Sequence, residues 1–312
     1  MKIASYCPPT LRNNIELQTE RWSAEKISAK TGITSRHIAT EEETALDLAY
    51  NAAKKLMDTS DINIEDVASL VYCTQSPDYI IPNNVSILHD KLGLEISAPT
   101  IEYNQGCSGY IYGLFIAKSL LLSNQVENVL LVTADTYTKY LQPNNYNCKT
   151  IFGDAATASF ISKKDAGGFG FFCFGTNGAG YEALYLKGEG AKLRGQSLDL
   201  YMNGPDIFSF ALDVVPLIIQ DTLHKNKLII DDIDYFIFHQ ANEFMLEALR
   251  EKINIPKEKF CLHFSEYGNT VSSTIPIVME YIQNNGQLQL GKKVLLCGFG
   301  VGLSWGATIL VI

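Results

Sequence analysis

Short apolar runs alternate with longer segments of helical periodicity through the whole chain. Thr44–Met57 carries apolar side chains at helical spacing, whereas Val67–Cys73 and Val129–Thr133 are continuous apolar runs that are typical of buried strands. The same patterns predict further helices at 84–92, 107–122, 206–223, 241–252 and 272–283, and extended segments at 99–103, 155–161, 235–238, 294–297 and 307–311.

A glycine-rich stretch between Gly167 and Gly180 separates two series of elements that follow a similar order. This order favours an α/β protein of three or more layers that is built from two similar halves. We predict that residues 1–167 form the first half and residues 168–312 the second. No flexible linker lies between them, so we expect both halves to pack as one body.

Composition narrows the class of function. The chain has 312 residues, a net charge of −9 and 46% hydrophobic residues, as in ordinary globular proteins. No run of Lys and Arg exceeds two residues, which argues against a nucleic-acid partner. We find no secretion signal and no apolar run of membrane-spanning length, and therefore expect a cytoplasmic protein without membrane contact. The seven scattered Cys residues include no CxxC pair, which argues against a zinc site or a disulfide framework.

Cys107 is the most informative of these cysteines. It follows an extended segment and a glycine, within Tyr103-Asn104-Gln105-Gly106-Cys107-Ser108-Gly109-Tyr110, and it opens the predicted helix 107–122. The dipole and the free amides of a helix N-terminus stabilise a thiolate, lower its pKa and make it a nucleophile. The structural alternative is a core cysteine at a tight turn.

Two further polar residues stand where chemistry is possible. His239 ends the strand Tyr235–Phe238, and residues at the carboxyl ends of strands form ligand sites in α/β proteins. Asn269 lies in a loop of small residues before the predicted helix 272–283. Taken alone, each has a structural explanation, a hydrogen-bonded core histidine and a helix-capping asparagine.

The run Gly298-Phe299-Gly300-Val301-Gly302-Leu303-Ser304-Trp305-Gly306 follows a predicted strand, so we considered a dinucleotide-binding loop. Its glycines lack the GxGxxG spacing, and the segment leads into another strand instead of a phosphate-binding helix. We therefore reject dinucleotide binding. The glycines instead predict close approach of backbone amides to a reacting carbonyl group.

Together these segments resemble the β-ketoacyl-acyl-carrier-protein synthase III family of the thiolase superfamily over nearly the whole chain. The matching pieces occur in family order and at compatible spacing. They are Thr31-Gly32-Ile33, Arg36-His37-Ile38-Ala39, Pro77-Asp78-Tyr79, Gly106-Cys107-Ser108-Gly109, Phe152-Gly153-Asp154-Ala155-Ala156, Met202-Asn203-Gly204, His239-Gln240-Ala241-Asn242, Gly268-Asn269-Thr270 and Phe299-Gly300 through Trp305-Gly306.

The resemblance implies a five-layer αβαβα fold, a homodimer and a catalytic triad of Cys107, His239 and Asn269. It implies that Cys107 takes an acyl group from a coenzyme A or carrier-protein thioester, without a bound cofactor or metal. His239 and Asn269 then stabilise the enolate that forms when a malonyl thioester loses carbon dioxide, and this carbanion attacks the acyl group. The backbone amides of Cys107 and Val301 form the oxyanion hole.

Several positions depart from the family pattern and indicate a specialised paralogue, in secondary metabolism or in the synthesis of an unusual acyl chain. Ile81 replaces the large aromatic residue that reaches into the partner subunit's acyl pocket, so we expect room for a longer or branched acyl group. The other departures fall where the family binds coenzyme A or its carrier protein, at Lys26, Lys30, Tyr146, Ser209 and Phe244.

Three alternatives remain open at this point. His239 follows Cys107 by 132 residues, near the roughly 130–150 residues of papain-like cysteine peptidases. A second alternative is a non-catalytic thiolase-fold subunit that binds a catalytic partner. The third is an acyltransferase that passes the acyl group to an amine or a hydroxyl.

Overall fold

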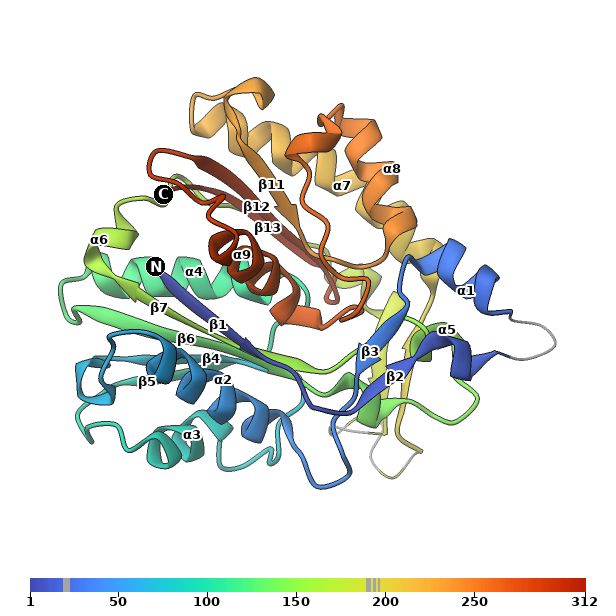
Figure 1. Ribbon diagram of the computed structural model, residues 1–312, viewed down its shortest axis with the longest axis horizontal. Coiled ribbons are helices and arrows are strands. Elements are labelled where there is room, and N and C mark those ends of the chain that lie inside the picture. The colour runs from blue at the N-terminus through green and yellow to red at the C-terminus, as the bar shows by residue number, and fades with distance from the viewer. Residues whose placement is uncertain (19–22, 189–191, 193–194, 196) are drawn as a thin grey trace.

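The computed structural model describes residues 1–18, 23–188, 192, 195 and 197–312, and these residues form five alternating layers of helices and sheets (Figure 1). Two sheets enclose a middle layer of helices, and each sheet is covered on its outer face by a further pair. This arrangement confirms the predicted αβαβα fold. The helices are α2 (Ala45–Thr59) and α3 (Asn84–Leu92) outside the first sheet, α4 (Gly109–Leu122) and α9 (Thr274–Asn284) in the middle, and α7 (Gly204–Lys225) and α8 (Glu243–Ile253) outside the second.

The two sheets repeat one topology. The first sheet has the order β1 (Lys2–Tyr6), β7 (Ala155–Ser162), β6 (Asn128–Asp135), β4 (Leu70–Cys73) and β5 (Thr100–Tyr103), and the second has β11 (Tyr235–Phe238), β12 (Lys293–Gly300), β13 (Ser304–Val311) and β8 (Cys173–Thr176). In the first sheet β4 pairs parallel with β6, β6 pairs antiparallel with β7, and β7 pairs antiparallel with β1. In the second sheet β11, β12, β13 and β8 pair in the same sequence of directions. The predicted boundary at residues 167 and 168 falls between the two sheets.

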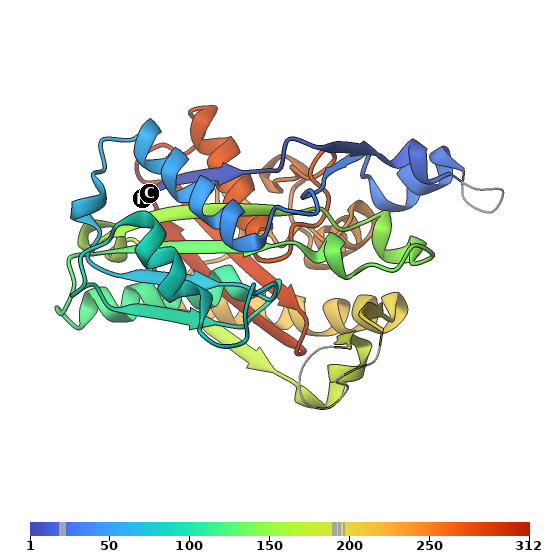
Figure 2. The same cartoon turned by 90° about the horizontal axis from the view of Figure 1, so that it is seen from below.

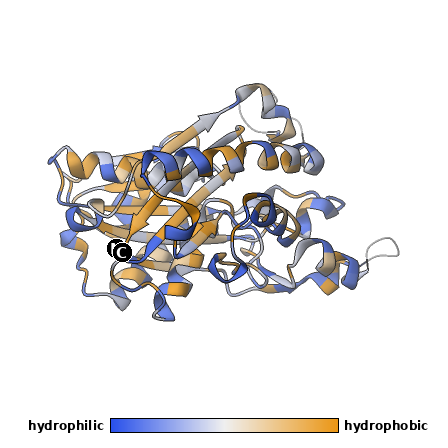
Figure 3. Cartoon of the chain, turned by 90° about the horizontal axis from the view of Figure 1, so that it is seen from above, coloured by the Kyte–Doolittle hydropathy of each residue, from blue (hydrophilic) through white to orange (hydrophobic). Residues whose placement is uncertain are grey.

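The middle layer explains the composition of α4. Its side chains Tyr110, Ile111 and Leu114 are fully buried between the sheets, where they meet Ile275 and Val278 of α9 in one hydrophobic cluster. A helix that touches apolar surfaces on opposite sides has few charges around its circumference. Figure 3 shows the same contrast, with apolar strands inside and mixed polarity on the outer helices.

Helix α7 is, among the described residues, the one helix whose length and composition would allow it to cross a membrane. Nearly half of its most apolar stretch is buried inside the protein, against the second sheet and α8. A core helix of a globular protein can have this length and composition, and the packing of α7 fits that explanation.

Smaller elements gather at one end of the layers, on the right in Figure 1, and were not predicted from the apolar pattern. They are three to eight residues long, so they carry little periodic signal. Seen from below, in Figure 2, this end lies opposite the two chain termini. The elements are α1 (Ala24–Thr31), α5 (Tyr146–Lys149), β2 (Leu11–Asn13), β3 (Ser35–His37), β9 (Leu184–Lys187) and β10 (Asp199–Met202). The short helix α6 (Lys163–Ala166) lies at the opposite end, beside the chain termini.

Two boundaries differ from the prediction in ways that affect the site. Cys107 does not open helix α4 but lies in the turn before it, since the helix begins at Gly109. Helix α9 begins at Thr274 instead of residue 272, after a 3₁₀ turn at Val271–Ser273, and Asn269 lies in the loop before it, as predicted. The glycine run at 298–306 joins β12 to β13 as a hairpin, as expected from the absence of a following helix.

Candidate active site

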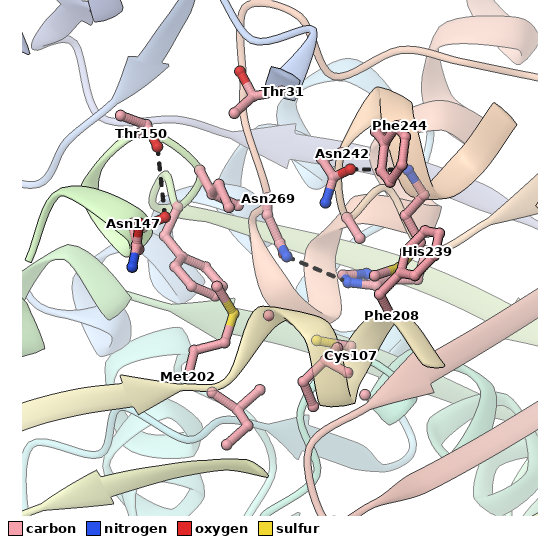
Figure 4. A pocket seen from close by; sticks show the side chains of 18 of the residues that line it. Thr31, Cys107, Asn147, Thr150, Met202, Phe208, His239, Asn242, Phe244 and Asn269 are labelled. Atoms are coloured by element: carbon pink, nitrogen blue, oxygen red, sulfur yellow. Dashed lines mark hydrogen bonds between the residues drawn. The ribbon is translucent and has the colours of Figure 1, made fainter. Parts of the chain in front are cut away.

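A cavity of about 450 Å³ lies between the two halves and brings together the three predicted side chains Cys107, His239 and Asn269 (Figure 4). The remaining walls come mostly from apolar and small residues. The short elements α1, α5, β9 and β10 at the end opposite the termini contribute to this lining. The lining residues include Thr31, Asn147, Thr150, Ile151, Phe152, Leu184, Met202, Ile207, Phe208, Ala241, Phe244, Met245, Phe299 and Gly300.

The repeated topology explains why distant residues meet here. Cys107 precedes α4 and Asn269 precedes α9, and these two helices occupy equivalent places before β6 and β12. His239 directly follows β11, whose parallel partner β12 ends at Gly300. The amino ends of both central helices and the carboxyl ends of these strands therefore open into one cavity.

Close backbone approach fixes the position of Cys107. A Cβ atom placed on Gly300 would lie 2.8 Å from the Cys107 Cβ and 2.9 Å from its Sγ, so only glycine leaves room for the sulfur. The backbone N–H groups of Val301 and of Cys107 itself donate to this sulfur. The two amides predicted to form an oxyanion hole therefore both point toward the thiol.

The predicted low pKa of the Cys107 thiol is wrong. Complete burial raises the pKa of Cys107 to about 12, and the nearby Asp135 carboxylate raises it further, whereas the two amide donors lower it. Desolvation outweighs the amides because an apolar cavity disfavours the thiolate. Cys107 is therefore a neutral thiol at neutral pH.

We expect alkylation of Cys107 by iodoacetamide to accelerate about tenfold per pH unit between about pH 6 and pH 9, because only the thiolate reacts and the raised pKa lies above this range. Peptide-resolved mass spectrometry after timed exposure separates Cys107 from the half-buried Cys7 and Cys261. A rate that levels off below about pH 8 would show a stabilised thiolate and contradict this assignment.

Asp135 at the end of β6 is the titratable neighbour that sequence reasoning missed. The backbone N–H of Gln75 and the hydroxyl of Ser272 donate to its carboxylate at 2.8 and 2.7 Å. Burial raises the pKa of Asp135 to about 7 despite these donors. The ionised carboxylate of Asp135 disfavours a thiolate at Cys107. Its hydrogen bond with Ser272 also links the segment that follows Asn269 to the first sheet. No motif in the sequence marks this residue.

Hydrogen bonds orient the other two predicted residues. Asn269 Oδ1 accepts from the backbone N–H of Val271 at 2.9 Å, which turns Nδ2 toward His239 Nε2, 3.4 Å away. His239 Nδ1 lies 2.8 Å from the hydroxyl of Thr274. Figure 4 shows these two nitrogens directed toward each other, and both side chains line the cavity. Thr274 also went unrecognised in the sequence, because it lies inside the predicted helix 272–283 and no motif marks it.

His239 is uncharged at neutral pH. Burial lowers the pKa of His239 to about 3, although a hydrogen bond to the Val271 carbonyl raises it. A neutral imidazole and a carboxamide form a polar wall without net charge. Such a wall can donate hydrogen bonds to a carbonyl oxygen that gains negative charge.

The residues at which the chain departs from the family pattern lie in different places, some at the cavity and one on the surface. Lys30 and Phe244 line the cavity, and the exposed Phe244 ring stacks on Phe208 at 5.1 Å. Ile81 lies on the surface with 87% of its area exposed and does not line the cavity of its own chain. In the described part of the chain, no group of three or more His, Cys, Asp or Glu side chains is placed to hold a metal ion.

Family profiles match both halves of the chain. The profile described as 3-oxoacyl-[acyl-carrier-protein (ACP)] synthase III matches residues 101–178, which include Cys107. The profile of the C-terminal part of the same family matches residues 223–312, which include His239 and Asn269. The three predicted residues therefore fall inside the matched segments.

Individual proteins are similar over almost their full length. The β-ketoacyl-[acyl-carrier-protein] synthase III of Fusobacterium nucleatum is 33% identical across 98% of this chain and 95% of its own. A crystal structure of a 3-oxoacyl-(acyl-carrier-protein) synthase III is 39% identical, with a TM-score of 0.94 over 99% of this chain and 98% of its own. The synthase III from Thermus thermophilus is 31% identical, with a TM-score of 0.92 over 100% and 98%. These likenesses contradict the cysteine peptidase alternative.

Proposed function

Because the chain belongs to the 3-oxoacyl-[acyl-carrier-protein] synthase III family, we propose that its cavity catalyses acyl transfer to Cys107 followed by decarboxylative condensation with a malonyl thioester. The enzyme is an acyltransferase of the β-ketoacyl synthase III type. The observation that supports this chemistry best is the meeting of the Cys107 thiol, two backbone amides and the Asn269–His239 wall in one apolar cavity.

In the first step the Cys107 sulfur attacks the carbonyl carbon of an acyl thioester. A bond forms between sulfur and this carbon, and the carbonyl electron pair moves onto oxygen. The amides of Cys107 and Val301 then stabilise the oxyanion as it develops. Collapse of the tetrahedral intermediate expels the carrier thiolate, which takes the thiol proton, and leaves acyl-Cys107.

In the second step a malonyl thioester places its thioester carbonyl oxygen against Asn269 Nδ2 and His239 Nε2. For this role the neutral imidazole carries its proton on Nε2 once the malonyl thioester is bound. The Thr274 hydroxyl, which otherwise donates to the Val271 carbonyl at 3.2 Å, then turns its proton to Nδ1, 2.8 Å away. The carbon–carboxylate bond breaks, carbon dioxide leaves, and the electron pair forms an enolate. The enolate carbon attacks acyl-Cys107, and expulsion of the Cys107 thiolate releases the β-ketoacyl product.

Members of this family use thioesters of coenzyme A and of acyl carrier protein, and we propose both as substrates here. The mostly apolar lining fits an acyl chain and the arm that carries it. Phe244 and Phe208 present stacked rings at the place where a basic carrier contact was expected. Lys26, Tyr146 and Ser209 depart from the same docking pattern, which supports a specialised donor within this family.

We further propose a cytoplasmic homodimer that is joined along the edge of the first sheet. Strand β5 ends this sheet, and an unpaired edge strand offers its amides and carbonyls to a second copy. Glu102 of β5 accepts from the backbone N–H of Val85, which holds the exposed Ile80 and Ile81 close to this edge. Ile81 would then enter the second copy and border its acyl pocket.

Light scattering in solution should report twice the monomer mass, and a monomer at micromolar concentration would refute the dimer.

Mass spectrometry of the intact protein tests the proposed function directly. Incubation with a panel of acyl-coenzyme A and acyl-carrier thioesters should add one acyl group to Cys107, and malonyl thioester should then release carbon dioxide and a β-ketoacyl product. Failure of every donor to acylate Cys107 would favour the non-catalytic alternative. Acylation without carbon dioxide release would favour transfer to an amine or a hydroxyl.

A further inference from the structure

A buried cluster of three polar side chains lies directly behind the two amides that face Cys107. Ser108 and Ser304 are almost fully buried, and their hydroxyl oxygens lie 2.8 Å apart. The Gln105 side-chain amide donates to Ser304 Oγ at 2.8 Å and to Ser108 Oγ at 3.2 Å. Residues from both halves of the chain, 196 positions apart, therefore meet in one network.

The hydrogen-bonding capacity of this cluster assigns its donors. Ser304 Oγ donates to the backbone carbonyl of Val301 at 2.8 Å. Its single proton is thereby used, so Ser304 accepts from both Gln105 and Ser108. Every polar atom of the two hydroxyl groups has a partner, and a fully satisfied buried network restrains the segments that it joins.

These segments carry the two amides of the predicted oxyanion hole. Gln105 and Ser108 flank Cys107 in the turn, and the Ser304 hydroxyl donates to the carbonyl of Val301 in the hairpin. A Cβ atom on Gly106 would lie 2.3 Å from a methyl group of Val301, so the turn and the hairpin already touch. A shift of either segment would change the distance between the amides of Cys107 and Val301.

We propose that Ser304 is a positioning residue, which with Ser108 and Gln105 clamps the nucleophile turn to the glycine hairpin and sets the spacing of the oxyanion-hole amides. This inference rests on the proposed acyl transfer at Cys107. It assigns the cluster to the steps in which the acyl carbonyl becomes tetrahedral. The clamp does not touch His239 or Asn269, so it has no part in loss of carbon dioxide from the malonyl thioester.

Single-turnover kinetics of Ser304→Ala test this proposal. Acylation of Cys107 should slow about 10-fold to 100-fold, since misplacing a catalytic group by about 1 Å costs about that much. Carbon dioxide release from malonyl thioester without an acyl donor should stay within about twofold of wild type. Ser304→Thr keeps the hydroxyl and should restore most of the acylation rate.

Ser159→Ala is the matched control for a lost buried hydroxyl. Ser159 is fully buried in the first sheet and bonds Tyr110 at 3.0 Å, away from the cavity lining. This variant should lose comparable thermal stability and keep its acylation rate. Parallel losses of acylation and decarboxylation in Ser304→Ala, or unchanged acylation, would overturn the clamp.

Alkylation by iodoacetamide separates this inference from the proposed function, because it needs no acyl substrate. The same two amides stabilise the Cys107 thiolate, so Ser304→Ala should be alkylated more slowly than wild type at one pH. If wild type never acylates but Ser304→Ala still shows slower alkylation, the function fails and the clamp stands. Equal alkylation rates would refute the clamp whatever the reaction.

Discussion

A Cys107→Ser variant should form no acyl adduct, with an acylation rate at least about 10³-fold below wild type. The substitution keeps the size of the side chain and leaves a hydroxyl where the amides of Cys107 and Val301 now donate to sulfur. It removes the nucleophile, because a serine hydroxyl without a dedicated base ionises far less readily than a thiol. Intact-protein mass after exposure to acyl thioesters measures the loss.

The same variant separates the two half-reactions. His239 and Asn269 are unchanged in it, so malonyl thioester should still lose carbon dioxide. Cys261→Ala serves as the matched control, because Cys261 is a half-buried thiol that does not line the cavity. That control should acylate at the wild-type rate. An acyl adduct on Cys107→Ser would place the nucleophile elsewhere and contradict the assignment of Cys107.

Much of the fold follows from local apolar patterns. The run Tyr235–Phe238 is a buried strand with the predicted bounds, and the helix Asn84–Leu92 also agrees. Strand β1 was missed because Lys2–Tyr6 is short and mixes polar with apolar positions. It becomes a strand through pairing with β7, which is a long-range contact that no local pattern contains.

The sequence predicts those site residues whose type and local position are unusual for a purely structural role. Cys107, His239 and Asn269 lie beside glycines or at strand and helix ends, where the sequence signals a special backbone position. The pKa of Cys107 was not predictable, because burial by the opposite half reverses the effect of the helix end. Ser304, Thr274 and Asp135 act through contacts between segments far apart in the chain, and no motif marks them.

The second large effect is expected at Asn269. An Asn269→Ala variant should keep acylation of Cys107 but release carbon dioxide about 10²-fold to 10³-fold more slowly, as when one donor to a developing oxyanion is removed. Asn269 contributes Nδ2 to the wall that faces the malonyl carbonyl. The amides that serve the acyl group lie on a different segment and are unchanged. Release of labelled carbon dioxide measures the effect.

Alanine at this position also leaves the backbone N–H of Val271 without its partner, so lower stability is a competing explanation for a slow variant. Asn269→Asp resolves this, because its carboxylate still accepts from Val271 but presents an oxygen in place of the donor Nδ2. Both variants should therefore lose decarboxylation, and Asn269→Ala, which adds no charge to the cavity of Cys107, should keep acylation. The rate of carbon dioxide release by the wild-type enzyme should show no acid limb from His239 between about pH 5 and pH 9, because burial lowers the pKa of His239 to about 3. Full decarboxylation by Asn269→Asp would mean that the carbonyl oxygen binds elsewhere.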